Sequence, residues 1–272
     1  MRLDQYLVLH HGLTRNKAQQ LIATDLVFVN AKICNKSSFQ ILENSIVTII
    51  DDRRVVWVSR SAEKLAGFIE RLDMVSDVSV PQGYTFQYHS SEYSGEIQSK
   101  KLTIAGTNCL DVGSSTGGFT QILLQYGATH IDAVDVGTDQ LHPSLRSDPR
   151  VSSYEQTDIR DFATEKQSHY DIIVCDASFI SLSMIIDAML TLSNIDTRMI
   201  LLYKPQFEVG RVNLRKTGVP KDIKIVEANM TEFENLLTTK NTNIIKKEKS
   251  SLIGEAGNQE WIYMIQKNPQ TI

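Results

Sequence analysis

Residues 110–120, LDVGSSTGGFT, constrain the fold more than any other part of this 272-residue chain. Leu110 and Val112 end an apolar segment of strand type, and the residues from Gly117 onward have helical periodicity. A strand, a glycine turn and a helix therefore follow one another, and strand and helix segments continue to alternate as far as residue 239. This alternation predicts an α/β domain with a parallel sheet, whose carboxyl edge holds the turn and is the usual place for a ligand.

The glycine turn distinguishes between classes of nucleotide site. A dinucleotide fingerprint has glycine at three points, but the middle point here is Ser115, which counts against a nicotinamide oxidoreductase. The turn resembles the first motif of class I S-adenosylmethionine methyltransferases, although an ordinary strand-to-helix turn can have the same pattern. The resemblance implies that S-adenosylmethionine is bound by the turn residues Asp111, Gly113, Ser115, Gly117, Gly118 and Phe119.

Polar residues recur where the later strands end. Asp135 follows the second strand, where its carboxylate can accept hydrogen bonds from both hydroxyls of an adenosine ribose. Asp158 follows the third strand, at a place suited to an adenine amino group, and Asp176 and Lys204 follow the fourth and fifth. With the neighbouring Val136 and Ile159, and with Asp176 itself, these aspartates complete the predicted cofactor-binding set.

Composition excludes several classes of protein. The chain is 42% hydrophobic and 22% charged, as expected of a soluble globular protein, and it has no apolar run long enough to span a membrane. Its start has no signal-peptide core. The three cysteines and six histidines lack metal-ligand spacing, so we expect reduced core thiols, no metal site and a cytoplasmic location.

The first 60 residues carry eight Lys or Arg against five Asp or Glu, in a chain whose net charge is −4. The periodicity predicts two helices followed by a small antiparallel sheet. The stretches RLDQYL, TRNKAQQLI and VFVNAKI resemble, in order, the signature of the S4-like RNA-binding domain. That resemblance implies that Arg2, Arg15 and Lys17 face RNA, whereas a solvated surface is the simpler alternative.

The glycine turn, CDASFISL, LLYKPQFEVGR and GNQEW together resemble the TlyA family over essentially the whole chain. Its members are often called hemolysins, and known members methylate the 2′-hydroxyl of cytidine in ribosomal RNA. The resemblance implies an S4-like domain over residues 1–56 and an FtsJ/RrmJ-like, class I (Rossmann-like) methyltransferase domain over residues 57–272. It also implies a catalytic tetrad of Lys64, Asp176, Lys204 and Glu260.

The tetrad suits the chemistry that the resemblance implies. A ribose hydroxyl must be aligned with an already activated methyl group and lose its proton. A lysine removes that proton only in its neutral form, which a second ammonium nearby favours, so we expect Lys204 to act as base or to polarise the hydroxyl. Lys64 supplies the second charge, and Asp176 and Glu260 position the two ammonium groups. From periodicity alone, Lys64 is a boundary residue that points to solvent.

Two further segments are candidates for RNA contact. Residues 208–224 carry five cations against two carboxylates, and we expect them to form an RNA-facing lid rather than a solvated loop. The predicted RNA-binding set thus adds Arg60, Arg211, Arg215 and Lys216. The polar segment 76–104 contains Tyr84, Phe86, Tyr88 and Tyr93, which can stack on RNA bases or belong to a surface loop.

We therefore expect an S-adenosylmethionine-dependent ribosomal RNA 2′-O-methyltransferase, monomeric and without a membrane partner. Two alternatives remain at this point: a catalytically silent RNA-binding factor of ribosome assembly, and a pore-forming hemolysin.

Overall fold

The structure is a computed structural model. It describes residues 1–11, 15–23, 27–30, 32–42, 45, 47–49, 57–72, 102–166, 168–254 and 256–269. These residues divide into two compact units, one within residues 1–49 and the other within residues 57–269. Residues 76–101 of the polar segment and the side chain of Lys17 lie outside the described part.

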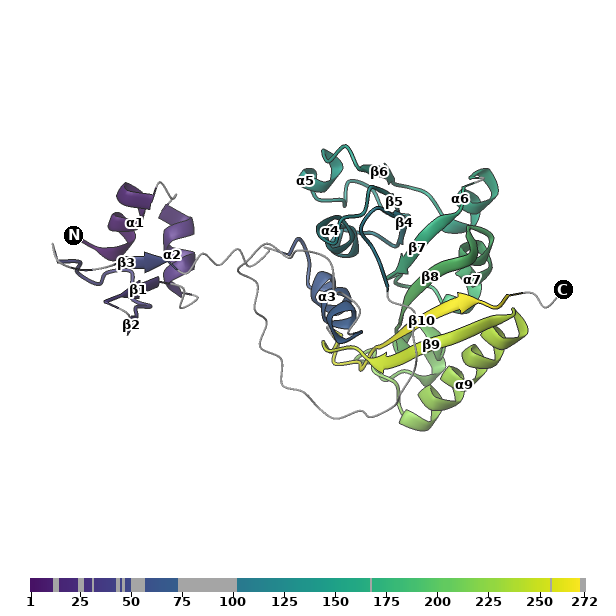
Figure 1. The fold of residues 1–272 in the computed structure, drawn as a ribbon. Helices are drawn as coiled ribbons and strands as arrows, with labels where there is room; N and C mark the ends of the chain where they lie inside the picture. Colours follow the sequence, from purple (N-terminus) through teal and green to yellow (C-terminus); the bar gives the residue numbers. More distant parts are fainter. Residues whose placement is uncertain are drawn as a thin grey trace. The chain divides into compact units, whose positions relative to one another are not determined.

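The first unit has the predicted two helices and small antiparallel sheet (Figure 1). Its elements are α1 (Leu3–His11), α2 (Arg15–Ala23), β1 (Val27–Val29), β2 (Lys32–Ile33) and β3 (Val47–Ile49), with strand order β2-β1-β3. Leu3 and Leu7 of α1 and Ile22 of α2 are completely buried, and they pack with Val27 of β1. Burial of these apolar faces stabilises the unit.

The second unit is built on a seven-stranded sheet of order β6-β5-β4-β7-β8-β10-β9. The strands are β4 (Asn108–Val112), β5 (His130–Val134), β6 (Val151–Tyr154), β7 (Tyr170–Cys175), β8 (Ser193–Tyr203), β9 (Thr242–Lys249) and β10 (Trp261–Lys267). The predicted parallel pairing holds from β6 to β8. The last two strands lie beyond residue 239, where the predicted alternation stops, and β10 pairs antiparallel to both β8 and β9. The described residues between β9 and β10 contain no helix, so no crossover reverses the chain before β10.

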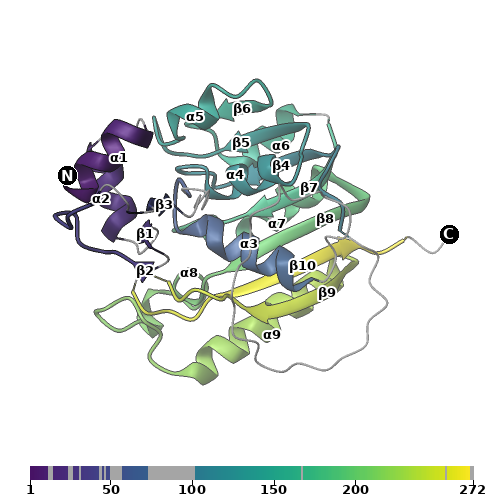
Figure 2. The same cartoon turned by 60° about the vertical axis from the view of Figure 1, so that its left-hand side comes forward.

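Helices cover both faces of this sheet (Figure 1). One face packs against α3 (Ser61–Arg71), α4 (Gly118–Gln125) and α5 (Pro143–Arg146); the other packs against α6 (Ile159–Glu165), α7 (Leu182–Thr191) and α9 (Ile223–Thr239). In Figure 2, α3 lies in front of the strands, and its Phe68 and Ile69 are completely buried. A single turn, α8 (Pro205–Glu208), and a 3₁₀ turn (Arg211–Asn213) follow β8. The expected α/β domain and small α+β unit are therefore both present.

The turn after β4 comes very close to the segment after β7. Gly113 has φ of 75°, and a Cβ atom added there would lie 2.8 Å from the backbone Cα of Ala177. Neither the conformation nor the distance suits a side chain. Glycine at this position therefore lets the first strand end directly beside the fourth.

Gly113→Ala and Gly106→Ala form a matched pair of variants that tests this contact. Gly106 has a similar φ of 81°, but a Cβ atom added there would have no described atom within 4 Å. Both variants should lose about 1–2 kcal/mol of stability from the left-handed conformation. Only Gly113→Ala should lose about 1–3 kcal/mol more from overpacking, measured by urea unfolding. Equal losses would show that the contact with Ala177 costs nothing.

Candidate active site

The sheet topology brings the end of one strand and the start of another to the same edge. Lys204 directly follows β8, and Glu260 directly precedes β10. Because β10 runs antiparallel to β8 with Trp261 opposite Tyr203, Glu260 lies next to Lys204 although the two are far apart in sequence. Asp176 follows the neighbouring β7, and Lys64 comes from α3.

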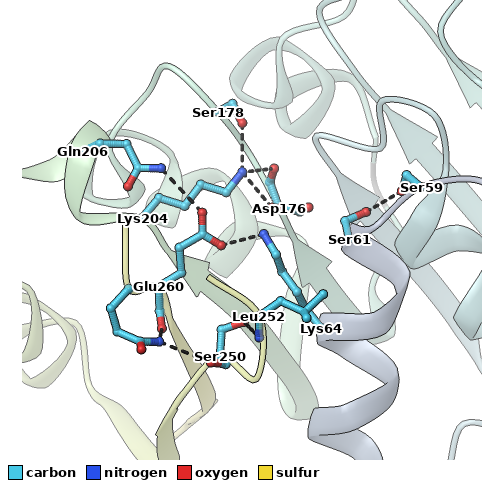
Figure 3. Close-up of polar contacts among 11 residues, drawn as sticks. Ser59, Ser61, Lys64, Asp176, Ser178, Lys204, Gln206, Ser250, Leu252 and Glu260 are labelled. Carbon is cyan, nitrogen blue, oxygen red and sulfur yellow. Dashed lines mark hydrogen bonds and ion pairs between the residues drawn. The ribbon is translucent and has the colours of Figure 1, made fainter. Parts of the chain in front are cut away.

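The side chains of these four residues converge as two ion pairs (Figure 3). Lys64 Nζ lies 2.6 Å from Glu260 Oε2, and Lys204 Nζ lies 2.7 Å from Asp176 Oδ1. All four side chains are at most 14% exposed. Removing one partner of such a buried pair leaves an uncompensated charge, so each member fixes the position of the other.

Lys64 is the clearest case in which helix periodicity alone misleads. That pattern predicts a side chain directed to solvent, but the Lys64 side chain is only 12% exposed and reaches Glu260. The apolar stripe of α3 packs on the sheet, and Lys64 at its border faces the cleft. The resemblance to the TlyA family, rather than the periodicity, selected this residue.

The sequence did not point to two residues that each contact one of the four side chains. Ser178 Oγ accepts a hydrogen bond of 2.8 Å from Lys204 Nζ. Gln206 Nε2 lies 3.5 Å from Glu260 Oε1. Each stands two residues after a selected one within a quoted motif, but that spacing in a turn does not indicate where a side chain points.

Two adjoining cavities meet at this edge of the sheet. The larger, of about 580 Å³, is lined by Lys64, Lys204, Glu260, Asp111 and Phe119 among others. The smaller, of about 320 Å³, is lined by Asp135, Val136, Asp158 and Ile159 among others. Both are lined by Gly113, Ser115, Asp176, Ser178 and Phe179. The segments after β4 and β7 thus form the boundary between the two cavities.

Two backbone N–H groups, one from the glycine turn and one from the segment after β5, hold Asp135 in place. Its two carboxylate oxygens accept hydrogen bonds from the backbone N–H groups of Ser115 at 2.8 Å and Gly137 at 2.7 Å. Gly117 and Gly118 line neither cavity. Gly118 serves packing instead, since a Cβ there would lie 2.2 Å from Ser61 Oγ of α3.

Asp158 has a structural partner in addition to its place at the smaller cavity. Its carboxylate caps α6 by accepting from the backbone N–H of Arg160, and both of its oxygens accept from the Arg160 guanidinium. The Arg160 side chain holds the pKa of Asp158 below its ordinary value. Its predicted contact with an adenine amino group would have to share this carboxylate with Arg160.

Asp111 is a completely buried carboxyl group beside the glycine turn. Its Oδ2 accepts a 2.6 Å hydrogen bond from Thr120 Oγ1, and its Oδ1 is buried without a hydrogen-bond partner among the described residues. Burial raises the pKa of Asp111 to about 7. A buried acceptor at the wall of the larger cavity is suited to a hydrogen-bond donor of a ligand.

The predicted RNA-binding cations lie in three places. Arg2 pairs with the buried carboxylate of Asp4 through two contacts of 2.9 Å, and Arg15 is exposed at the start of α2. Arg60 is exposed at the rim of the larger cavity. The exposed cations of the segment after α8 are Arg211, Arg215 and Lys216. This segment folds back on itself through a bridge between Leu214 and Pro220.

Two family models match this chain, and several known proteins resemble it over most of its length. The family model described as FtsJ-like methyltransferase matches residues 57–267, and the S4 domain model matches residues 1–47. The 23S rRNA (cytidine-2′-O)-methyltransferase TlyA of Campylobacter jejuni is 36% identical, over 98% of this chain and 100% of its own length. The 16S/23S rRNA (cytidine-2′-O)-methyltransferase TlyA of Mycobacterium tuberculosis is 32% identical, over 96% and 87%. Hemolysin A of Brachyspira hyodysenteriae is 30% identical, over 96% and 98%.

The length and polarity of the helices determine whether any of them could cross a membrane. Within the described part of the chain, every helix is too short or too polar to cross a bilayer.

Asp111→Asn should change how stability depends on pH. The native state keeps a proton on Asp111 up to about pH 7, whereas the unfolded chain releases it near pH 4. This carboxyl group therefore destabilises the native state progressively as the pH rises from about 4 to about 7. The free energy of unfolding of the asparagine variant, relative to that of the wild type, should increase by about 2.5 kcal/mol from pH 5 to pH 8, measured by urea unfolding. A difference independent of pH would contradict the raised pKa.

Proposed function

The chain belongs to the TlyA family of FtsJ-like methyltransferases, and from this premise we propose that it methylates a ribose 2′-hydroxyl of ribosomal RNA with S-adenosylmethionine as the donor. The target nucleotide is a cytidine, as the names of the two rRNA-modifying relatives state for those enzymes. The observation that carries the proposal is the convergence of Lys64, Asp176, Lys204 and Glu260 beside the glycine turn.

The residues around the two cavities fit the methyl donor. Asp135, held by two backbone N–H groups, has lone pairs left for the hydroxyls of the adenosine ribose. Val136 and Ile159 offer apolar contacts to the purine in the smaller cavity. The buried Oδ1 of Asp111 suits the amino group of the methionine part, beside the turn at Gly113 and Ser115.

The four convergent residues then act on the RNA. The bound donor supplies a methyl group that its sulfonium charge has already activated. Lys204, starting the step as a neutral amine after releasing a proton to solvent, takes up the proton of the 2′-hydroxyl. The electron pair left on the ribose oxygen forms the bond to the methyl carbon. Lys64, paired with Glu260, orients the ribose and stabilises the developing negative charge.

The predicted RNA-binding cations support recognition of a large RNA. Arg60, Arg211, Arg215 and Lys216 surround or lie near the larger cavity, and Arg2, Arg15 and Lys17 belong to the S4 unit. Contacts to phosphates position a nucleic acid without reading its sequence. We assign the S4-like domain to residues 1–56, the methyltransferase domain to residues 57–272, and a monomeric, cytoplasmic state to the enzyme.

Lys204→Ala and Lys64→Ala should each lower the rate of methyl transfer on the order of 10²–10⁴-fold, because they remove the proton acceptor and the orienting charge. The assay is transfer of labelled methyl groups from S-adenosylmethionine to ribosomal subunits from cells that lack the gene, with the modified nucleotide mapped. Binding of S-adenosylmethionine, measured by calorimetry, should persist.

Lys240→Ala is the control, because Lys240 pairs with the exposed Asp187 and lines neither cavity. If both active-site variants transfer methyl groups at the wild-type rate, the assignment of the four residues as catalytic is wrong. A wild-type protein that binds subunits but transfers no methyl group would favour a silent assembly factor.

Changing Arg211, Arg215 and Lys216 together to alanine should raise the KM for ribosomal RNA about tenfold or more. The slope of log binding constant against log salt should fall by about 2, since each lost phosphate contact contributes about 0.7–0.9. A variant with Arg146, Arg150 and Lys240 changed to alanine removes the same charge from residues outside both cavities. An equal loss in both variants would mean that net charge, rather than this segment, determines RNA affinity.

A further inference from the structure

Lys204 Nζ is surrounded by three oxygen atoms, all from the segment after β7 (Figure 3). They are Asp176 Oδ1 at 2.7 Å, Ser178 Oγ at 2.8 Å and the Asp176 backbone oxygen at 3.0 Å. Lys204 Nζ donates hydrogen bonds to Ser178 Oγ and to the Asp176 backbone oxygen, and it forms an ion pair with the Asp176 carboxylate. The charged lysine is therefore held by this one segment before any RNA arrives.

The three oxygens differ in what they can do when the lysine is neutral. A carboxylate oxygen and a carbonyl oxygen only accept, so neither oxygen of Asp176 can give a proton to a neutral amine. Ser178 Oγ, 2.8 Å from Nζ, is the one neighbour of the three with a proton to give. A serine hydroxyl both donates and accepts, and it therefore serves both states of Lys204.

Ser178 is more accessible to the cavities than Lys204. The Lys204 side chain is only 9% exposed, whereas Ser178 is exposed and lines both cavities. A hydroxyl group that enters the cleft can therefore reach Ser178 Oγ without first reaching Nζ. The proton of the ribose hydroxyl can then reach Lys204 through Ser178, without a direct contact between the ribose and the lysine.

Resting on the proposed function, we propose that Ser178 is a further catalytic residue, which relays the proton of the ribose 2′-hydroxyl to Lys204. The 2′-hydroxyl gives its proton to Ser178 Oγ while Ser178 gives its own proton to the lone pair of Lys204 Nζ. The ribose oxygen forms the bond to the methyl carbon, and the electron pair of the carbon–sulfur bond goes to sulfur. Serine ends the step as a neutral hydroxyl, and Lys204 as an ammonium that later returns its proton to solvent.

The backbone around Ser178 is held in a fixed geometry, as a relay requires. Phe179, the next residue, has φ of 65°, a left-handed conformation that is unfavourable for a residue with a side chain. The Glu208 carboxylate holds the following residues by accepting from Ser181 Oγ at 2.5 Å and from the backbone N–H of Leu182 at 2.9 Å. Glu208 ends the same segment that Lys204 begins, so the two segments are joined on both sides of Ser178.

The test compares Ser178→Ala, Ser178→Thr and Ser183→Ala by the single-turnover rate of methyl transfer to ribosomal subunits. Ser178→Ala should lose on the order of 10²-fold in rate, with an unchanged Kd for S-adenosylmethionine and an unchanged midpoint for RNA binding. Ser178→Thr keeps the hydroxyl and should recover most of the rate. Ser183, an exposed serine of α7 that lines neither cavity, should tolerate alanine.

The solvent isotope effect separates a relay from a packing role. In mixtures of H₂O and D₂O, the wild-type rate should curve with deuterium content, because two protons move in one step. The residual rate of Ser178→Ala should vary linearly, because one proton moves directly.

Wild-type rates in Ser178→Ala, equal losses in the alanine and threonine variants, or a linear wild-type dependence would each overturn the relay. If Lys204→Ala is inactive while Ser178→Ala is fully active, only the relay fails. If the wild type transfers no methyl group to RNA, the proposed function itself fails.

Discussion

The antiparallel pairing of β10 with β8 is the interaction on which the site depends. Trp261 lies opposite Tyr203, so the residue before β10 and the residue after β8 become neighbours: Glu260 beside Lys204. A shift of one residue in this register would turn each side chain of β10 to the other face of the sheet. Tyr263 and Ile265 would leave one core cluster and Ile262 and Met264 the other. The pairing that completes the core therefore also sets how close Glu260 lies to Lys204.

Charge pairing explains how four ionised groups can share a cleft with little access to water. Each ammonium lies within 2.7 Å of a carboxylate, so the site holds two positive and two negative charges as two ion pairs. Burying such pairs contributes little net stability, since the desolvation of the ions offsets their attraction. What the pairs provide is position: α3 is tied to the start of β10 through Lys64 and Glu260, and the ends of β7 and β8 are tied through Asp176 and Lys204.

The sequence predicted the elements well because their apolar periodicity is strong. The sequence alone was enough to predict the strand, glycine turn and helix at residues 110–120. It was also enough to predict the polar strand ends at Asp135 and Asp176. The direction of β9 and β10, which lie beyond the predicted alternation, was not predicted, because alternation of strands and helices indicates direction only where a helix intervenes. The inward direction of Lys64 depends on which side of α3 meets the sheet, which a residue at the border of an apolar stripe does not reveal. The contribution of Ser178 depends on a left-handed backbone at Phe179, for which a phenylalanine gives no signal.

The segment of residues 176–179 unites the two cavities, because Asp176, Ser178 and Phe179 line both. A methyl donor with its adenosine in the smaller cavity and a ribose in the larger one would therefore meet across a single stretch of backbone. The turn at Gly113 packs so tightly on this stretch that a Cβ atom on the glycine would lie 2.8 Å from the Cα of Ala177, and Glu208 holds the far end at Leu182. The segment is thus clamped between the first strand and α8, and neither cavity can change shape at this boundary without moving the other. In a transfer reaction this coupling keeps the reacting groups of the two ligands in a fixed position relative to each other. The backbone therefore contributes to their alignment as well as the side chains.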